Sequence, residues 1–270
     1  MTARHNLLVL ENNANPLMSI AQVAYEHEGT HYKDCFFYPE SFEQPVPIVL
    51  VIPDYHGMTP YAQAEARWLS EMGFVGYCVD IYGEQTMPRS SEDAASKVMP
   101  LFENRACTLA RMQVALQRAC SLDGVDSSRS GVIGFSSGGL FALDIARRIK
   151  SVRAVASVWG VSLPWELKPA PMIESNVNGA NVLLIHGTKD IFNPMESNMN
   201  LIQELDEAGT DYQLILLGGK KHAFSLKTED NLEVLCGEEP QALLYDQISD
   251  QRAHHYVAHF LSEAFAEDHR

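Results

Sequence analysis

The residues with the clearest chemical potential lie in the stretch GFSSGG, residues 134–139. Its spacing around Ser136 is G-x-S-x-G, in which the serine occupies a sharp turn between a strand and a helix. Gly134 and Gly138 suit such a turn because a Cβ atom at either position would collide with neighbouring backbone. The pattern predicts Ser136 as a nucleophile; the alternative is a structural turn in which Ser136 or Ser137 only caps the helix.

A serine hydroxyl becomes a good nucleophile only with a base beside it and an acid that orients the base. With this type of turn, the expected chain order is serine, then Asp or Glu, then histidine. Asp190 follows the apolar run at 181–187, and His222 follows the next run at 212–219. We therefore expect Asp190 to orient His222, and His222 to take the proton from Ser136. The alternatives are a loop cap for Asp190 and a surface side chain for His222.

The other histidines are interpreted as structural. His186 ends a strand and is expected to support or line a pocket rather than to act as the base. His255 and His259 are four residues apart, a spacing that can bind zinc, but their segment offers no third ligand. Together with His254 they are interpreted as one face of a helix. The sequence therefore predicts neither a metal site nor a cofactor.

The elements that must position these residues alternate between apolar strands and amphipathic helices. Strands are expected at 46–52, 74–82, 130–135, 152–160, 181–187 and 212–219. Helices are expected at 60–73, at 137–149, at 194–209 and within 240–266. Another helix is expected after the strand at 74–82, with its beginning interrupted by Pro100 and with one apolar face formed by Leu109, Met112, Leu116 and Ala119. Two runs, 20–26 and 33–38, predict an N-terminal β-hairpin. The sequence thus predicts an α/β fold whose mostly parallel central sheet carries helices on both faces and binds ligands beyond the carboxyl ends of its strands.

Composition and charge narrow the possible functions. The chain has 270 residues, a formal net charge of −15 and a pI near 5.0. This charge opposes binding to nucleic acid and to anionic membranes. The five cysteines are widely spaced without a C-x-x-C pattern, which is typical of reduced thiols. Because the N-terminus also lacks the apolar core of a secretion signal, we expect a cytoplasmic protein with one domain spanning 1–270.

Over residues 20–265 the sequence resembles the dienelactone hydrolase family within the α/β-hydrolases. The resemblance rests on IVLVIPDYHGMTPYAQAEARWLSEMGFVGYCVDIYG, IGFSSGG, LLIHGTKD and GGKKHAF. It implies the α/β-hydrolase fold and a hydrolase of esters or lactones. The backbone N–H of Ser137, at the start of a helix, can point at a developing oxyanion. The resemblance implies the N–H of Tyr55 as the second donor.

Three departures from the family pattern bear on the substrate. The family often has cysteine at the elbow, whereas Ser136 depends fully on its base. Family members commonly carry glutamate after the first central strand, where this chain has the shorter Asp54, which we expect to shape the pocket. The arginines that bind the carboxylate of dienelactone in the type enzyme have no counterpart, since Leu226 follows HAFS and Gly83-Glu84 follow DIY. This argues against dienelactone itself as the substrate.

Residues at the ends of the predicted strands are expected to line a substrate pocket. The alternative is that the aromatic residues among them are ordinary core side chains. These residues are Asp54, Tyr55, His56, Tyr82, Trp159 and Phe224. The proline-rich stretch 161–180 is a candidate lid.

The predicted function is hydrolysis of a small carboxylic ester or lactone through an acyl-enzyme on Ser136. One alternative is an acyltransferase that passes the acyl group to an acceptor other than water. Another is a non-catalytic ligand-binding protein on a hydrolase fold. Neither nucleic acid nor a membrane is expected as a partner, and a homodimer stays an open alternative.

Overall fold

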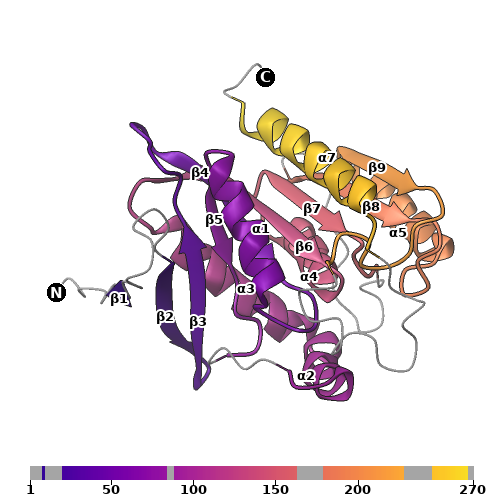
Figure 1. Ribbon diagram of the computed structural model, residues 1–270, viewed down its shortest axis with the longest axis horizontal. Helices are drawn as coiled ribbons and strands as arrows, with labels where there is room; N and C mark the ends of the chain where they lie inside the picture. The colour runs from indigo at the N-terminus through magenta and orange to yellow at the C-terminus, as the bar shows by residue number, and fades with distance from the viewer. Residues whose placement is uncertain (1–7, 10–19, 84–87, 163–178, 228–244, 267–270) are drawn as a thin grey trace.

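The computed structural model describes residues 8–9, 20–83, 88–162, 179–227 and 245–266. Within these ranges the chain forms one sheet with helices on both faces (Figure 1). The strands are β1 (Leu8–Val9), β2 (Ala21–His27), β3 (Thr30–Phe37), β4 (Val46–Ile52), β5 (Val75–Cys78), β6 (Val125–Phe135), β7 (Ala154–Val158), β8 (Asn181–Gly187) and β9 (Tyr212–Leu217). The helices are α1 (Pro60–Glu71), α2 (Ser91–Glu103), α3 (Arg105–Cys120), α4 (Ser137–Arg148), α5 (Met195–Ala208) and α7 (Gln247–Phe265).

The strand order across the sheet is β1-β2-β3-β5-β4-β6-β7-β8-β9. The first three strands pair antiparallel, and β3 also pairs antiparallel with β5. From β5 onward the neighbours are parallel. The predicted α/β fold, with its mostly parallel sheet and N-terminal hairpin, is confirmed. The carboxyl ends of the parallel strands therefore meet at one edge of the sheet, where such folds bind their ligands.

Strand β4 explains why helices cover both faces of the sheet. Its residues Val49 and Val51 belong to the core beneath α1 and α7, whereas Ile48, Leu50 and Ile52 belong to the core beneath α3, α4 and α5. Successive side chains of a strand point to opposite faces, so an unbroken apolar run has two buried faces. Figure 1 shows α1 and α7 side by side on the near face, with α3, α4 and α5 behind the strands.

Several boundaries differ from the prediction. Pro100 lies inside α2, and the chain breaks its helix at Asn104 instead, because the Asn104 side chain accepts the Cys107 N–H at 3.2 Å and so caps α3. Strand β6 begins at Val125, five residues earlier than predicted. Most of the candidate lid, 163–178, lies outside the described residues. Across the parts of the chain that are described, no helix has the length and apolar character to cross a membrane.

Candidate active site

Loops that follow neighbouring parallel strands carry the chemically active side chains. Because β4, β6, β7, β8 and β9 are consecutive in the sheet, these loops converge at its carboxyl edge. In sheet order, the residues just beyond the strand ends are Asp54 and Tyr55, Ser136, Trp159, Asp190, and His222.

The turn at Ser136 joins β6 to α4 in a conformation that L-residues rarely adopt. Its φ is 52° and its ψ is −118°, which places the side chain at the apex of a tight bend. A Cβ atom on Gly134 would lie 2.1 Å from the carbonyl oxygen of Gly138, and one on Gly138 would lie 2.2 Å from that of Ile52. The two flanking glycines are therefore required sterically, as the G-x-S-x-G spacing predicts.

The structure brings Ser136, His222 and Asp190 together in one hydrogen-bonded chain. Ser136 Oγ lies 2.8 Å from His222 Nε2, and His222 Nδ1 lies 2.8 Å from Asp190 Oδ2. All three residues are more than nine-tenths buried. An ionised carboxylate only accepts hydrogen bonds, so Nδ1 of His222 donates to Asp190 and Nε2 accepts from the Ser136 hydroxyl. This arrangement suits a base that removes the proton of the serine.

Both partners of Ser136 are themselves held in place. Asp190 Oδ1 accepts the backbone N–H groups of Phe192 at 2.9 Å and Asn193 at 3.1 Å, which leaves Oδ2 for His222. The imidazole of His222 contacts two rings, Trp159 edge-on at 5.1 Å and Phe192 at 4.9 Å. The carboxylate and the imidazole are thus fixed relative to each other before any substrate binds.

His186 lies beside this chain but is not part of it. Its side chain is fully buried, and its Nδ1 accepts a hydrogen bond from the Asn193 amide at 3.0 Å. Burial lowers the pKa of His186 to about 4, although the charge of Asp190 acts in the opposite direction. A histidine that stays neutral at pH 7 supports the loop of Asp190, which agrees with its interpretation as a structural residue.

Backbone groups at two of the strand ends can stabilise negative charge. Ser137 is the first residue of α4, and N–H groups in the first turn of a helix have no acceptor within the helix. Tyr55 follows β4, and its carbonyl accepts the hydroxyl of Tyr82. Both Ser137 and Tyr55 line the cavity beside Ser136. Their role as oxyanion donors stays a prediction.

The cavity beside Ser136 has a volume of about 200 Å³ and is mainly apolar. Of the predicted pocket residues, Asp54, Tyr55 and Trp159 line it. His56, Tyr82 and Phe224 are not among its lining residues, and their contact with substrate stays a prediction. His56 bonds to Asp54, the Tyr82 hydroxyl binds backbone, and Phe224 is fully buried in the core. The prediction missed six lining residues: Val98, Phe102, Val161, Phe192, Ala223 and Leu226.

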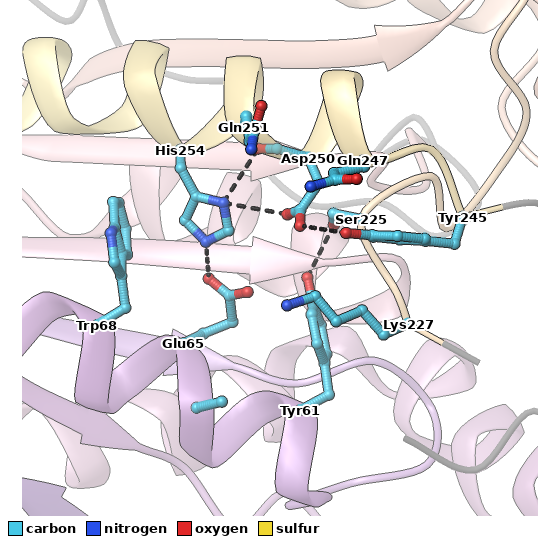
Figure 2. Close-up of a pocket in the computed structure, with 11 residues that line it drawn as sticks. Tyr61, Glu65, Trp68, Ser225, Lys227, Tyr245, Gln247, Asp250, Gln251 and His254 are labelled. Atoms are coloured by element: carbon cyan, nitrogen blue, oxygen red, sulfur yellow. Dashed lines mark hydrogen bonds and ion pairs between the residues drawn. The ribbon is translucent and has the colours of Figure 1, made fainter. Parts of the chain in front are cut away.

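A second, larger cavity of about 470 Å³ lies between α1 and α7. Figure 2 shows His254 of α7 reaching Glu65 of α1 with one ring nitrogen and Asp250 with the other, each at 3.0 Å. Burial lowers the pKa of His254, but its hydrogen bonds to Asp250 and Glu65 outweigh burial and raise it to about 10. His254, interpreted from sequence as part of a helix face, is thus an imidazolium that links two helices.

The described residues contain no cluster of three or more His, Cys, Asp or Glu side chains arranged to hold a metal ion. The sheet topology is that of the α/β-hydrolase class. The chain belongs to the dienelactone hydrolase family, because the model of that family matches residues 35–265. It is therefore a hydrolase that acts on ester or lactone bonds.

Individual relatives are distant. A probable 2-oxo-3-(5-oxofuran-2-ylidene)propanoate lactonase from Bradyrhizobium sp is 26% identical over 184 residues, which cover 66% of this chain and 73% of that protein. The solved structure named m3DLH has a TM-score of 0.83 at 23% identity and covers 93% of this chain and 100% of its own. A dienelactone hydrolase-like promiscuous phosphotriesterase from metagenomic libraries, P91, has a TM-score of 0.81 at 24% identity with the same coverage. At these identities the two structures support the fold alone.

Proposed function

We propose that this protein is a serine hydrolase that cleaves small carboxylic esters or lactones through an acyl-enzyme on Ser136. The observation that carries the proposal is the buried hydrogen-bonded chain from Ser136 through His222 to Asp190, with 2.8 Å in each link. A lactone is a cyclic ester and reacts by the same chemistry, and the Bradyrhizobium relative is named as a probable lactonase.

In the acylation step, His222 Nε2 takes the proton of Ser136 as Oγ attacks the carbonyl carbon. The carbonyl oxygen becomes an oxyanion, and the N–H groups of Ser137 and Tyr55 are the proposed donors to it. The imidazolium then gives its proton to the leaving alkoxide while the C–O bond breaks, which leaves an acyl-enzyme. Asp190 stays ionised throughout and stabilises the imidazolium.

In the deacylation step, water takes the position of the alcohol, which has left when the substrate is an open ester and stays attached to the acyl chain when it is a lactone. His222 removes a proton from the water as its oxygen attacks the acyl carbon, and a second oxyanion forms in the same position. The imidazolium returns this proton to Ser136 Oγ as the acyl bond breaks. The products are a carboxylic acid and the free enzyme, so atoms and charges balance without any other reactant.

The test is the replacement of Ser136, compared with its neighbour in the elbow. Ser136→Ala should lower kcat for p-nitrophenyl acetate by about 10³-fold or more and abolish labelling by a fluorophosphonate probe. Ser137→Ala should still be labelled, because the proposed contribution of Ser137 is its backbone N–H. Full activity in Ser136→Ala would refute the proposal.

A further inference from the structure

The charge of the cavity beside Ser136 comes from a single carboxylate. Among its described lining residues, Asp54 is the one acidic side chain, and neither lysine nor arginine is present. Uncharged polar groups of Tyr55, Ser136 and Ser137 and the imidazole of His222 also line the cavity. The rest of the lining is mainly apolar, including Val98 and Phe102 from α2 and Leu226 beyond His222. Within the described lining, an acyl group therefore meets mainly hydrocarbon and one acidic side chain.

Asp54 keeps part of its carboxylate available to the cavity. It is 4% exposed, and its Oδ1 accepts both the backbone N–H and the ring Nδ1 of His56, at 2.8 and 2.9 Å. Within the described part of the chain, both hydrogen bonds of the Asp54 carboxylate are to Oδ1, which leaves Oδ2 without one. Asp54 also acts on its surroundings, since burial and then the charge of Asp54 raise the pKa of Tyr82.

Burial makes this carboxylate effective against a charged ligand. The interaction between two charges grows as the local dielectric falls, and a buried pair is screened far less by salt than an exposed one. A carboxylate on the acyl part of a substrate would lose its hydration in the apolar cavity and would face Asp54 without a balancing cation. An uncharged acyl chain pays neither cost and packs against Val98, Phe102 and Leu226.

The three internal segments outside the described residues carry little positive charge. Residues 84–87, 163–178 and 228–244 contain one basic side chain, Lys168, among several acidic ones, and the whole chain carries −15. Among the described lining residues, Asp54 and the apolar side chains are the groups that can distinguish a charged acyl part from an uncharged one.

We infer that the site selects esters whose acyl part is uncharged or cationic, and that Asp54 is the residue that rejects anionic acyl groups. The inference rests on the proposed function and narrows its substrate class. It assigns to Asp54 a role in specificity, without a part in the proton transfers of His222.

Three p-nitrophenyl esters of similar size test the inference on the unaltered protein. They are the neutral pentanoate, the anionic mono-ester of glutarate, and the cationic 4-(trimethylammonio)butanoate. In about 0.5 M salt, where the field of distant surface charges is screened, kcat/KM for the glutarate should be at least about tenfold below that for the pentanoate. The cationic ester should react at least as well as the pentanoate.

A variant with a matched control assigns the effect to Asp54. Asp54→Asn removes the charge and retains the shape, so it should raise the glutarate-to-pentanoate ratio of kcat/KM by about tenfold. Glu71→Gln removes the same charge from an exposed position in the last turn of α1 and should leave the ratio unchanged.

The outcomes separate this inference from the proposed function. Equal kcat/KM for glutarate and pentanoate in a protein whose activity still requires Ser136 would overturn the inference alone. An unchanged ratio in Asp54→Asn, or a cationic ester slower than the neutral one, would also overturn it. If none of the three esters were hydrolysed, both the inference and the proposed function would fail.

Discussion

Ser136 Oγ and His222 Nε2 lie 2.8 Å apart although 86 positions separate the two residues in the chain. Backbone strain is concentrated around this contact. Of the four non-glycine residues with positive φ in the described part of the chain, three lie here: Ser136 at 52°, Trp159 at 39° and Ala223 at 55°. Such conformations persist only where the surrounding structure holds them, and they occur preferentially at functional sites.

The first prediction concerns the acid that orients the base. Asp190→Asn should lower kcat for a p-nitrophenyl ester by about 10³- to 10⁴-fold. The amide oxygen can still accept the N–H groups of Phe192 and Asn193, but its NH₂ group cannot accept the proton on His222 Nδ1. The imidazole then moves its proton to Nε2 and can no longer take one from Ser136. A decrease smaller than tenfold, in a variant with unchanged melting temperature, would contradict the assignment of Asp190.

The second prediction concerns the steric requirement of the elbow. In Gly138→Ala the new Cβ would lie 2.2 Å from the carbonyl oxygen of Ile52, so the end of β4 or the start of α4 must shift. We expect a loss of about 1–3 kcal/mol in stability or more, together with a loss of most esterase activity. Thermal unfolding and ester hydrolysis measure the two effects.

Gly218→Ala is the matched control for the elbow variant. A Cβ atom at Gly218 would meet no atom within 4 Å, and its φ is not in the left-handed region. This variant should fold and react like the original protein. Equal behaviour of the two alanine variants would show that the close approach at Gly138 is unimportant.

The three residues of the hydrogen-bonded chain could be predicted because each has a local sequence signal. Ser136 lies in a glycine-flanked turn, and Asp190 and His222 each follow an apolar strand in the expected chain order. The direction of a side chain beyond a strand has no such signal. Ala223 lines the cavity whereas its neighbour Phe224 is fully buried in the core, because the chain turns here with Ala223 at a positive φ of 55°, a conformation that the local sequence does not reveal.

Contacts between distant helices could not be predicted from the sequence either. Val98 and Phe102 line the cavity from α2, but apolar residues at helical spacing look the same whether they face a core or a pocket. The ion pair between Glu65 and His254 joins residues 189 positions apart. Its formation depends on how α1 and α7 pack on the sheet, which no local pattern specifies.

The third prediction concerns His186 and acid stability. Because burial lowers its pKa from 6.5 to about 4, the unfolded chain binds a proton at His186 more readily than the folded one. The contribution to stability is present above pH 6.5 and is lost as the pH falls from 6.5 through 4, by roughly 2–3 kcal/mol. In urea titrations, His186→Gln should therefore show a smaller loss of unfolding free energy between pH 7 and pH 4.5 than the original protein.

An exposed histidine provides the control for this comparison. His255 lies on the solvent side of α7. In His255→Gln, the free energy of unfolding should therefore depend on pH as it does in the original protein. If His186→Gln retained it too, the acid sensitivity would come from other groups and the role assigned to His186 would be wrong.

The fourth prediction concerns the imidazolium that links α1 and α7. The pKa of His254 is raised from 6.5 to about 10 in the folded protein, so its contribution to stability is present below pH 6.5 and is lost as the pH rises through 10. Glu65→Gln removes one of the two carboxylates and should cost about 1–3 kcal/mol at pH 6. The difference from the original protein should shrink in urea titrations between pH 7 and pH 10. Glu263→Gln, which breaks the exposed pair with His259 on the same helix, should change little at any pH. A constant difference for Glu65→Gln across this range would mean that Glu65 stabilises the helix pair without the charge of His254.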